Sequence, residues 1–414
     1  MDPITQTTRS LNFRNVTTSY ASYLMAQYKS LPYIVNKLEA IYVEEKNKLV
    51  SFIREKGLQG SANDTIGTVD TKLSIPIQYI TEYDKLYTGI QNIINVNKNL
   101  LYTQFVDSVT QFDNFLQNLM RCVYNQHPDI LSNSDNKITY KELLNLSTIE
   151  NAKEFVVEKE LTELFYKGHT DQFKQFFKIT KVDVIKEMDD LFKSLVEITE
   201  RRNIHVHCHG KVSQQYVDRC TENKVNVTAS VGDELLIDKD YFLDSIDKLL
   251  ELAVKIGYLV WKKQERSEKE AADMFLINLC SSLISQERCN IVVSLVDYLI
   301  DYKDNNMSQV NKHLLKMYWI CAHKHMGHVE ETNKGINEDW TSVKPMITLI
   351  LDVLRDDFDS AINQMLHIGN DPKDFDKNMY SESSLFSELV KEQKFQDAYR
   401  QLYGVDFCYS RLSV

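Results

Sequence analysis

Residues 182–212 read VDVIKEMDDLFKSLVEITERRNIHVHCHGKV, and this stretch decides the fold class. Its apolar residues recur every three or four positions, which predicts an amphipathic helix packed on one face. They are Val182, Ile185, Met188, Leu191, Phe192, Leu195, Val196 and Ile198. The acids between 183 and 200 are expected to form its solvated face. Gly210 is the expected end of this helix, because glycine accepts the left-handed conformation that often follows a last helical turn.

The same periodicity continues on both sides of this helix and predicts an all-α fold. Glycine (12) and proline (6) are scarce, whereas all-β folds need many turns. Further helices are expected at 20–56, 77–127, 140–146, 152–166, 213–220, 240–261, 271–286, 290–302, 307–327, 341–355, 358–368, 382–393 and 395–403. Small and polar residues predict loops at 57–76 and 132–137, and 225–237 is expected to be irregular.

A chain of 414 residues is long enough for two or three domains. The expected division is a helical extension with a linker at 1–76, a helical domain at 77–265 and a stack of helical hairpins at 266–414. Short, paired apolar segments joined by a few polar residues are typical of tetratricopeptide-like hairpins, although the repeat consensus is absent. Ala361 and Ala398 are expected at close helix crossings. The charged run 262–270 predicts a solvated junction.

Composition and net charge indicate the cellular compartment and the kinds of partner that are expected for this chain. No run of about 20 apolar residues could span a bilayer, and the first residues lack a signal-peptide pattern. The seven cysteines are dispersed and never spaced C-x-x-C, so a cytoplasmic protein with reduced thiols and no membrane association is expected. The net charge of −11 disfavours a general nucleic-acid coat, but a nuclease needs only a local basic groove.

The side chains best suited to catalysis lie in the segment from Arg202 to His207. Transesterification of RNA needs groups that accept and donate protons, which histidine supplies, and a cation beside phosphorus, which arginine supplies. Asn203 and His207 are four residues apart and therefore share one helical face. Arg202 is five residues from His207, about 140° round an ideal helix. It must reach around the helix, or a second subunit must complete the pair. Arg201 shares the face of His205.

An arginine, a polar residue and then a histidine near the end of a long amphipathic helix resemble the HEPN superfamily. Arg202-x4-His207 fits the spacing of that family, and Asn203 fits the polar residue that often follows the arginine. A longer string is similar to a group of bacterial HEPN proteins with helical carboxy-terminal regions. It comprises Arg201, Arg202, Asn203, Val206, His207, Gly210, Val212 and Tyr216. The resemblance covers residues 150–265 best.

The resemblance implies an all-α HEPN helical bundle and a metal-independent endoribonuclease without a cofactor. Arg202 and His207 would be catalytic and Asn203 would assist them, with the motifs of two subunits facing each other in a homodimer. The candidate auxiliary residues are Arg201, His205, His209, Lys211 and Tyr216. Many members are toxins or act against phage. The implied partners are therefore tRNA or mRNA and an antitoxin or defence protein.

Two other interpretations of this segment stay open. Arg202 could form a surface ion pair and His207 could cap the helix, in a non-catalytic scaffold or a nucleotide- or protein-binding HEPN module. His205, His207, Cys208 and His209 could also suggest a metal cluster. Alternate residues share a face only in a strand, however, and the pattern here is helical. No metal is expected.

Two groups nearer the carboxyl end also have ordinary interpretations. His323, His325 and His328 are expected at a helix end near Gly327, on a solvated surface rather than in a metal site. Four aromatic residues are expected in the core of the hairpins rather than on a base-stacking platform. They are Tyr298, Tyr302, Tyr318 and Trp319.

Overall fold

The computed structural model describes residues 11–58, 74–133, 138–146, 148–166, 169–182, 188–303, 305–340, 343–371 and 375–408. Within these ranges every regular element is a helix, and the strand-like pairing is the isolated bridge between Lys211 and Glu234. The predicted all-α class is confirmed. The chain divides into two compact units, one made of Met1–Thr18 with Val254–Val414 and the other of Ser19–Ala253. The domain boundaries expected at residues 76 and 265 stay predictions.

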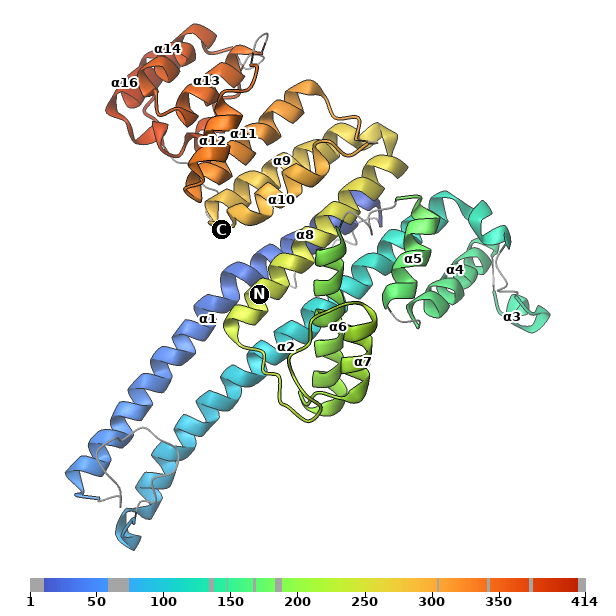
Figure 1. Ribbon diagram of the computed structural model, residues 1–414, viewed down its shortest axis with the longest axis vertical. Coiled ribbons are helices and arrows are strands. Elements are labelled where there is room, and N and C mark those ends of the chain that lie inside the picture. The colour runs from blue at the N-terminus through green and yellow to red at the C-terminus, as the bar shows by residue number, and fades with distance from the viewer. Residues whose placement is uncertain are drawn as a thin grey trace. The chain divides into compact units, whose positions relative to one another are not determined.

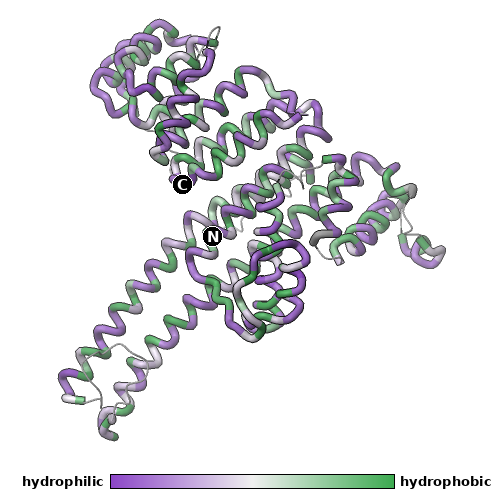
Figure 2. Tube along the Cα trace, in the orientation of Figure 1, coloured by the Kyte–Doolittle hydropathy of each residue, from purple (hydrophilic) through white to green (hydrophobic). Residues whose placement is uncertain are grey.

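Two long helices dominate the second unit: α1 (Phe13–Glu55) and α2 (Ile80–Gln126), which lie side by side (Figure 1). The Tyr20 ring stacks on Phe115 with centroids 5.1 Å apart, and the Tyr20 hydroxyl donates to the Ser108 carbonyl oxygen at 3.1 Å. Apolar and polar residues alternate along both helices (Figure 2), as the sequence periodicity predicts for an amphipathic pair.

The ends of this pair match the local sequence signals. α2 ends at Gln126, before the His127-Pro128 pair that was expected to close it. It begins after a 3-10 turn at Ile77–Tyr79, and the cluster of Phe52, Ile53 and Leu58 packs near this end against Tyr79, Tyr83, Leu86 and Leu49. Most of the loop expected at 57–76 lies outside the described residues, as does 134–137 of the loop expected at 132–137. Residues 132 and 133 belong to a 3-10 helix, Pro128–Asn133.

Shorter helices pack on this pair. The second unit also contains α3 (Tyr140–Leu144), α4 (Ile149–Phe165), α5 (His169–Thr180), α6 (Asp189–Cys208), α7 (Gln214–Glu222) and the start of α8 (Lys239–Gln264). α4, α5 and α6 contact α2, and α7 contacts α6. Helix α5 was not predicted. The helix expected from Val182 begins at Asp189 instead; Val182 follows the end of α5, and 183–187 lie outside the described residues.

The first unit begins with the start of α1, up to Thr18, and contains the remaining helices. They are the end of α8, α9 (Lys269–Ser285), α10 (Cys289–Leu299), α11 (Gln309–His325), α12 (Val329–Ile336), α13 (Pro345–Leu354), α14 (Phe358–Ile368), α15 (Met379–Glu382) and α16 (Gln393–Tyr403), with 3-10 turns at Arg266–Glu268, Ser384–Phe386 and Leu389–Lys391. Successive helices contact each other from α9 to α12, and α14 contacts α13 and α16. Ala361 and Ala398 are buried on α14 and α16.

In this unit one helix was missed and one predicted helix was wrong. Helix α12 was not predicted, and the helix expected at 382–393 is a series of short turns. Ser383 marks the first break in the second case. Its backbone is extended, and its hydroxyl accepts a hydrogen bond from the Leu385 amide at 3.3 Å, which competes with helical pairing.

The charged run at 262–270 is exposed or partly exposed except at Lys262, so the predicted solvated junction is wrong at that residue. Helix α8 continues through Lys262, whose side chain is 5% exposed. Its ammonium lies 2.5 Å from an Asp273 carboxylate oxygen and 2.6 Å from the Asn305 side-chain oxygen. A buried charge needs such partners, and here they come from residues outside the run itself.

The four aromatic residues that were expected in the core differ in burial. Tyr318 and Trp319 are buried on α11, whereas Tyr298 and Tyr302 are only partly buried.

Five cysteines are buried as free thiols: Cys122, Cys220, Cys280, Cys289 and Cys321. Cys208 is partly buried and Cys408 is exposed. Across the described ranges, no helix combines the length and apolar character that crossing a membrane would require.

Candidate active site

Helix α6 carries the predicted site and ends close to the predicted position. It ends at Cys208, and both His209 (φ 52°) and Gly210 (φ 79°) are left-handed, so the turn begins one residue before Gly210. The Gly210 amide donates to the Ile204 carbonyl oxygen at 3.1 Å. A Cβ at position 210 would lie 3.0 Å from Cε1 of His205, so the left-handed backbone and the close ring both favour glycine.

One face of α6 holds a half-buried polar network around Glu197. Its carboxylate accepts hydrogen bonds from Arg201 Nε at 2.7 Å, from the Tyr216 hydroxyl at 2.9 Å and from the Tyr241 hydroxyl at 2.7 Å. The Arg201 guanidinium lies 3.8 Å from the centroid of the Tyr241 ring. Burial, and then the Glu197 charge, raise the pKa of Tyr216 above its ordinary value.

This network corrects one expectation and places two candidate residues. The acids at 183–200 do not all form a solvated face, because the Glu197 side chain is only 18% exposed and binds three partners. Arg201 and Tyr216, proposed as auxiliary site residues, are engaged in this network. Their contacts hold α6 against α7 and the start of α8.

Arg202 points away from this network, toward α2. Its Nη2 donates to an Asp113 carboxylate oxygen at 3.2 Å, and its side chain is 19% exposed. Nε of Arg202 is buried and has no hydrogen-bond partner among the described residues. Arg202 is also absent from the residues that line the hollow around His207. Within one chain, the two residues of the Arg-x4-His motif therefore face different surroundings.

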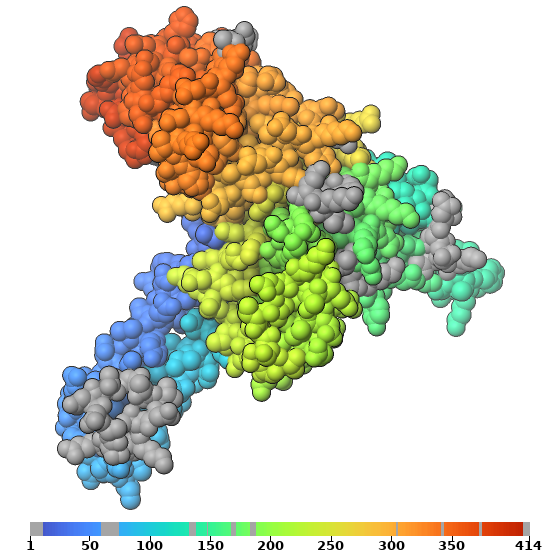
Figure 3. Space-filling model, in the orientation of Figure 1, coloured from blue at the N-terminus to red at the C-terminus, as the bar shows by residue number. Residues whose placement is uncertain are grey.

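His207 lies in a small hollow of about 390 Å³ between α6 and the beginning of α7. Its lining residues are Glu200, Asn203, Ile204, His207, Cys208, Ser213 and Gln215. The His207 ring is exposed, and the Asn203 amide donates to Glu200 at 3.4 Å. In the space-filling view the α6–α7 region, coloured lime, lies at the surface (Figure 3). An imidazole, an amide and a carboxylate can move and orient protons here, but the lining contains no lysine or arginine.

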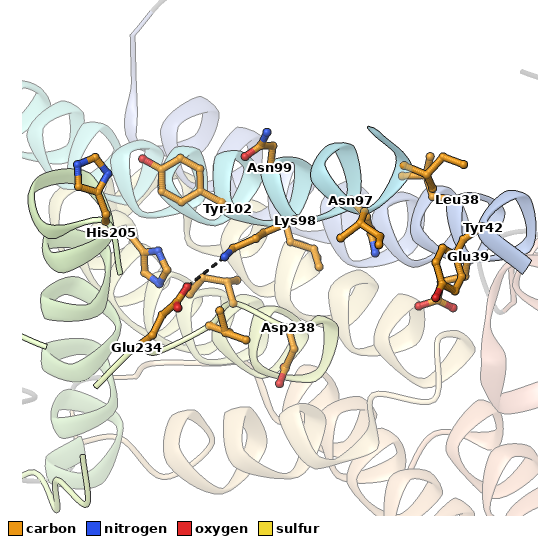
Figure 4. A pocket seen from close by; sticks show the side chains of 16 residues that line it. Leu38, Glu39, Tyr42, Asn97, Lys98, Asn99, Tyr102, His205, Glu234 and Asp238 are labelled. Atoms are coloured by element: carbon orange, nitrogen blue, oxygen red, sulfur yellow. Dashed lines mark hydrogen bonds and ion pairs between the residues drawn. The ribbon is translucent and has the colours of Figure 1, made fainter. Parts of the chain in front are cut away.

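A larger cleft of about 630 Å³ lies among α1, α2, the end of α6 and the segment after α7. His205 and His209 line it, and the Tyr102 ring lies 5.7 Å from the His205 ring. At this cleft Lys98 pairs with Glu234 at 3.0 Å (Figure 4). Two auxiliary candidates therefore belong to a different cavity from His207. Nothing in the sequence singled out Tyr102 or Lys98, because they follow the ordinary periodicity of a long helix.

Lys211 is the remaining auxiliary candidate. Lys211 is exposed and forms the isolated bridge with Glu234, so its backbone shapes the turn after α6.

The histidine group at the end of α11 corrects another expectation. His323, predicted on a solvated surface, is only 7% exposed, and its Nδ1 lies 3.1 Å from Nδ1 of His328.

Comparisons with known proteins leave the resemblance to be tested by experiment. No protein-family model matches the chain. No curated protein matches it. No solved structure matches it. The HEPN resemblance therefore rests on the residues around Arg202 and His207, and their predicted roles stay predictions.

Proposed function

We propose that the chain is a metal-independent endoribonuclease that cleaves single-stranded RNA, with a site completed by two copies of the chain. The observation that carries this proposal is the exposed His207 ring at the end of α6, in a hollow shared with Asn203 and Glu200. An exposed imidazole beside an amide and a carboxylate is suited to proton transfer at a bound ribose.

In the proposed reaction a neutral His207 accepts the proton of the ribose 2′-hydroxyl as that oxygen attacks phosphorus. The bond from phosphorus to the 5′-oxygen breaks, and the leaving oxygen takes the proton that the same His207 accepted from the 2′-hydroxyl. The products are a 2′,3′-cyclic phosphate and a 5′-hydroxyl, so no water or metal takes part. Asn203 orients the imidazole or a phosphate oxygen.

The distribution of charge supports a two-chain site. The developing negative charge on phosphorus needs a cation, and the hollow around His207 has none among its lining residues. Arg202 is the cation that the HEPN resemblance assigns to this role, but within its own chain it pairs with Asp113. A two-fold dimer would bring Arg202 of the partner subunit near His207, and such dimers are the commonest oligomers. By the same resemblance we propose a toxin or anti-phage effector, with an antitoxin or defence protein as partner.

A second function, non-catalytic binding by a helical scaffold, is favoured by the ion pair between Arg202 and Asp113. A half-buried arginine held by a carboxylate on another helix contributes to packing, whether or not the protein cleaves RNA. Cleavage assays separate the two functions, because a scaffold does not depend on the protonation chemistry of His207.

The deciding experiment incubates the purified chain with single-stranded RNA in EDTA and identifies the fragment ends by mass spectrometry. We expect cyclic phosphate and 5′-hydroxyl ends, no cleavage of DNA, and loss of about 100-fold or more of the rate in His207→Asn, as removal of an acid–base group usually costs. His367→Asn, an equivalent change at an exposed histidine on α14, is the matched control. Ends with a 5′-phosphate that disappear in EDTA, or full activity in His207→Asn, would refute the proposal.

A further inference from the structure

The turn between α11 and α12 in the first unit brings together three potential metal ligands. His323 lies in the last turn of α11, and His328 is the residue just before α12. Gly327, with φ 75°, reverses the chain between them, and the His328 amide donates to the His323 carbonyl oxygen at 3.0 Å. Glu331 follows in the first turn of α12. Potential ligand atoms of these three side chains lie within 4.8 Å of one another.

The position of the His323 ring is determined by packing. The ring lies against Trp319 with centroids 4.1 Å apart, and the Trp319 indole donates to Asp297 at 2.7 Å. Nε2 of His323 is buried and has no hydrogen-bond partner among the described residues. Nδ1 is therefore the ring atom through which His323 makes its polar contact, and that contact is with Nδ1 of His328.

Two Nδ1 atoms 3.1 Å apart must share something, because two lone pairs that face each other repel. They can share a proton, which one ring donates to the other, or a cation that both rings bind. In a tetrahedral zinc site, two imidazole nitrogens at about 2.0–2.1 Å from the metal lie about 3.4 Å apart. The observed separation is within a few tenths of an ångström of that geometry. The Glu331 carboxylate adds an oxygen ligand and a negative charge.

We propose that His323, His328 and Glu331 bind one Zn²⁺ through two Nδ1 atoms and a carboxylate oxygen, with water in the fourth position. Imidazole nitrogens favour zinc over magnesium and calcium, which prefer oxygen ligands. The metal would link the end of α11 to the start of α12. This proposal is independent of the endoribonuclease, because every ligand lies in the first unit.

The test uses the full chain without a histidine tag, freed of metal by a chelator and titrated with Zn²⁺ in a calorimeter. We expect one Zn²⁺ per chain, and at least about 10-fold weaker binding in His328→Gln and Glu331→Gln, because loss of a ligand should cost no less than loss of its supporting hydrogen bonds. His325→Gln and Glu330→Gln are matched controls, since both side chains are exposed and lie outside the cluster.

A second measurement guards against misfolded variants. Zn²⁺ should raise the thermal midpoint of the parent chain and of both controls, because a ligand that binds the folded state stabilises it. It should raise the midpoint of His328→Gln and Glu331→Gln by less at the same Zn²⁺ concentration. These two side chains are exposed, so their replacement tests binding without disturbing the core, as replacement of His323 would. No stoichiometric binding, or equal affinity in all five proteins, would overturn the proposal and leave a proton shared by the two rings.

Discussion

Glu197 shows how a single residue organises the surroundings of the candidate site. Its carboxylate accepts three hydrogen bonds, from Arg201 on the same helix, from Tyr216 on α7 and from Tyr241 on α8. Hydrogen bonds to a charged group in a half-buried position are among the stronger polar contacts in proteins. These hydrogen bonds connect α6, which carries His207, to α7 and α8.

Replacing Glu197 with alanine should destabilise the protein by about 3 kcal/mol, because the change leaves a half-buried guanidinium and two phenols without their acceptor. Urea unfolding measures the change. Glu163→Ala, at an exposed acid on α4, should stay within about 0.5 kcal/mol of the parent. If both variants unfold at the same urea concentration as the parent, the network does not stabilise the fold.

His205 should make stability depend on pH. Burial lowers its pKa, and a hydrogen bond involving the Leu235 backbone offsets part of that effect. The unfolded chain, with a histidine pKa of about 6.5, therefore binds more protons than the folded chain just below that pH. The contribution of His205 to the free energy of unfolding is therefore complete above pH 6.5. It declines as the pH falls from 6.5 toward the pKa of His205 in the folded chain. His205→Gln should flatten this decline, whereas His367→Gln should not; equal slopes in the two variants would contradict the assignment.

At the scale of elements, helices α1 and α8 contact each other at a point that the apolar periodicity of neither helix predicts. Gly257 on α8 lies so close to Thr17 on α1 that a Cβ at 257 would be 2.6 Å from Thr17 Cγ2 and 2.8 Å from Thr17 Oγ1. Thr17 itself is buried. A glycine in the middle of a helix usually weakens it, so this one is explained by close approach.

Gly257→Ala should destabilise the protein by about 1–3 kcal/mol through overpacking, despite the better helix propensity of alanine. Thr17→Ala removes both clashing atoms, so the double variant should be more stable than the sum of the single changes predicts. A double-mutant cycle by urea unfolding measures this coupling. Additive effects would show that the helices separate freely at this contact.

At the scale of the whole molecule, the proposed site needs two chains, and mixing experiments can test this. Arg202→Lys keeps a charge for Asp113 but loses the planar fork that suits phosphate, and His207→Asn removes the proton-transfer group. Each variant alone should be inactive. If Arg202 of one chain acts with His207 of the other, an equimolar mixture should recover about a quarter of the parent activity, because half the dimers carry one intact site of two.

Sedimentation of the 48.3 kDa chain supplies the matching measurement of assembly. A dimer at micromolar concentration is expected. A strict monomer with full activity, or a mixture as inactive as its components, would remove the two-chain site. The stability of Arg202→Ala should also fall below that of the parent, because the ion pair with Asp113 would be lost. Removal of an exposed arginine would cost little, but the Arg202 side chain is only 19% exposed.

The sequence by itself determined most of the helices and several of their ends. The periodicity of α1, α2 and α8 and the closing signals at Pro128 and Gly210 are written in residues a turn or two apart, so they need no knowledge of distant parts of the chain. Helices α5 and α12 escaped prediction.

The tertiary structure alone decided the surroundings of the charged and titratable side chains. Glu197, Lys262 and His323 all looked solvated in the sequence, and each is buried or half-buried with a specific partner. Arg202 turns toward Asp113, which is 89 residues away in the chain, instead of toward His207. A polar group can be buried only where another element supplies its hydrogen bonds, and no local pattern records which element that is.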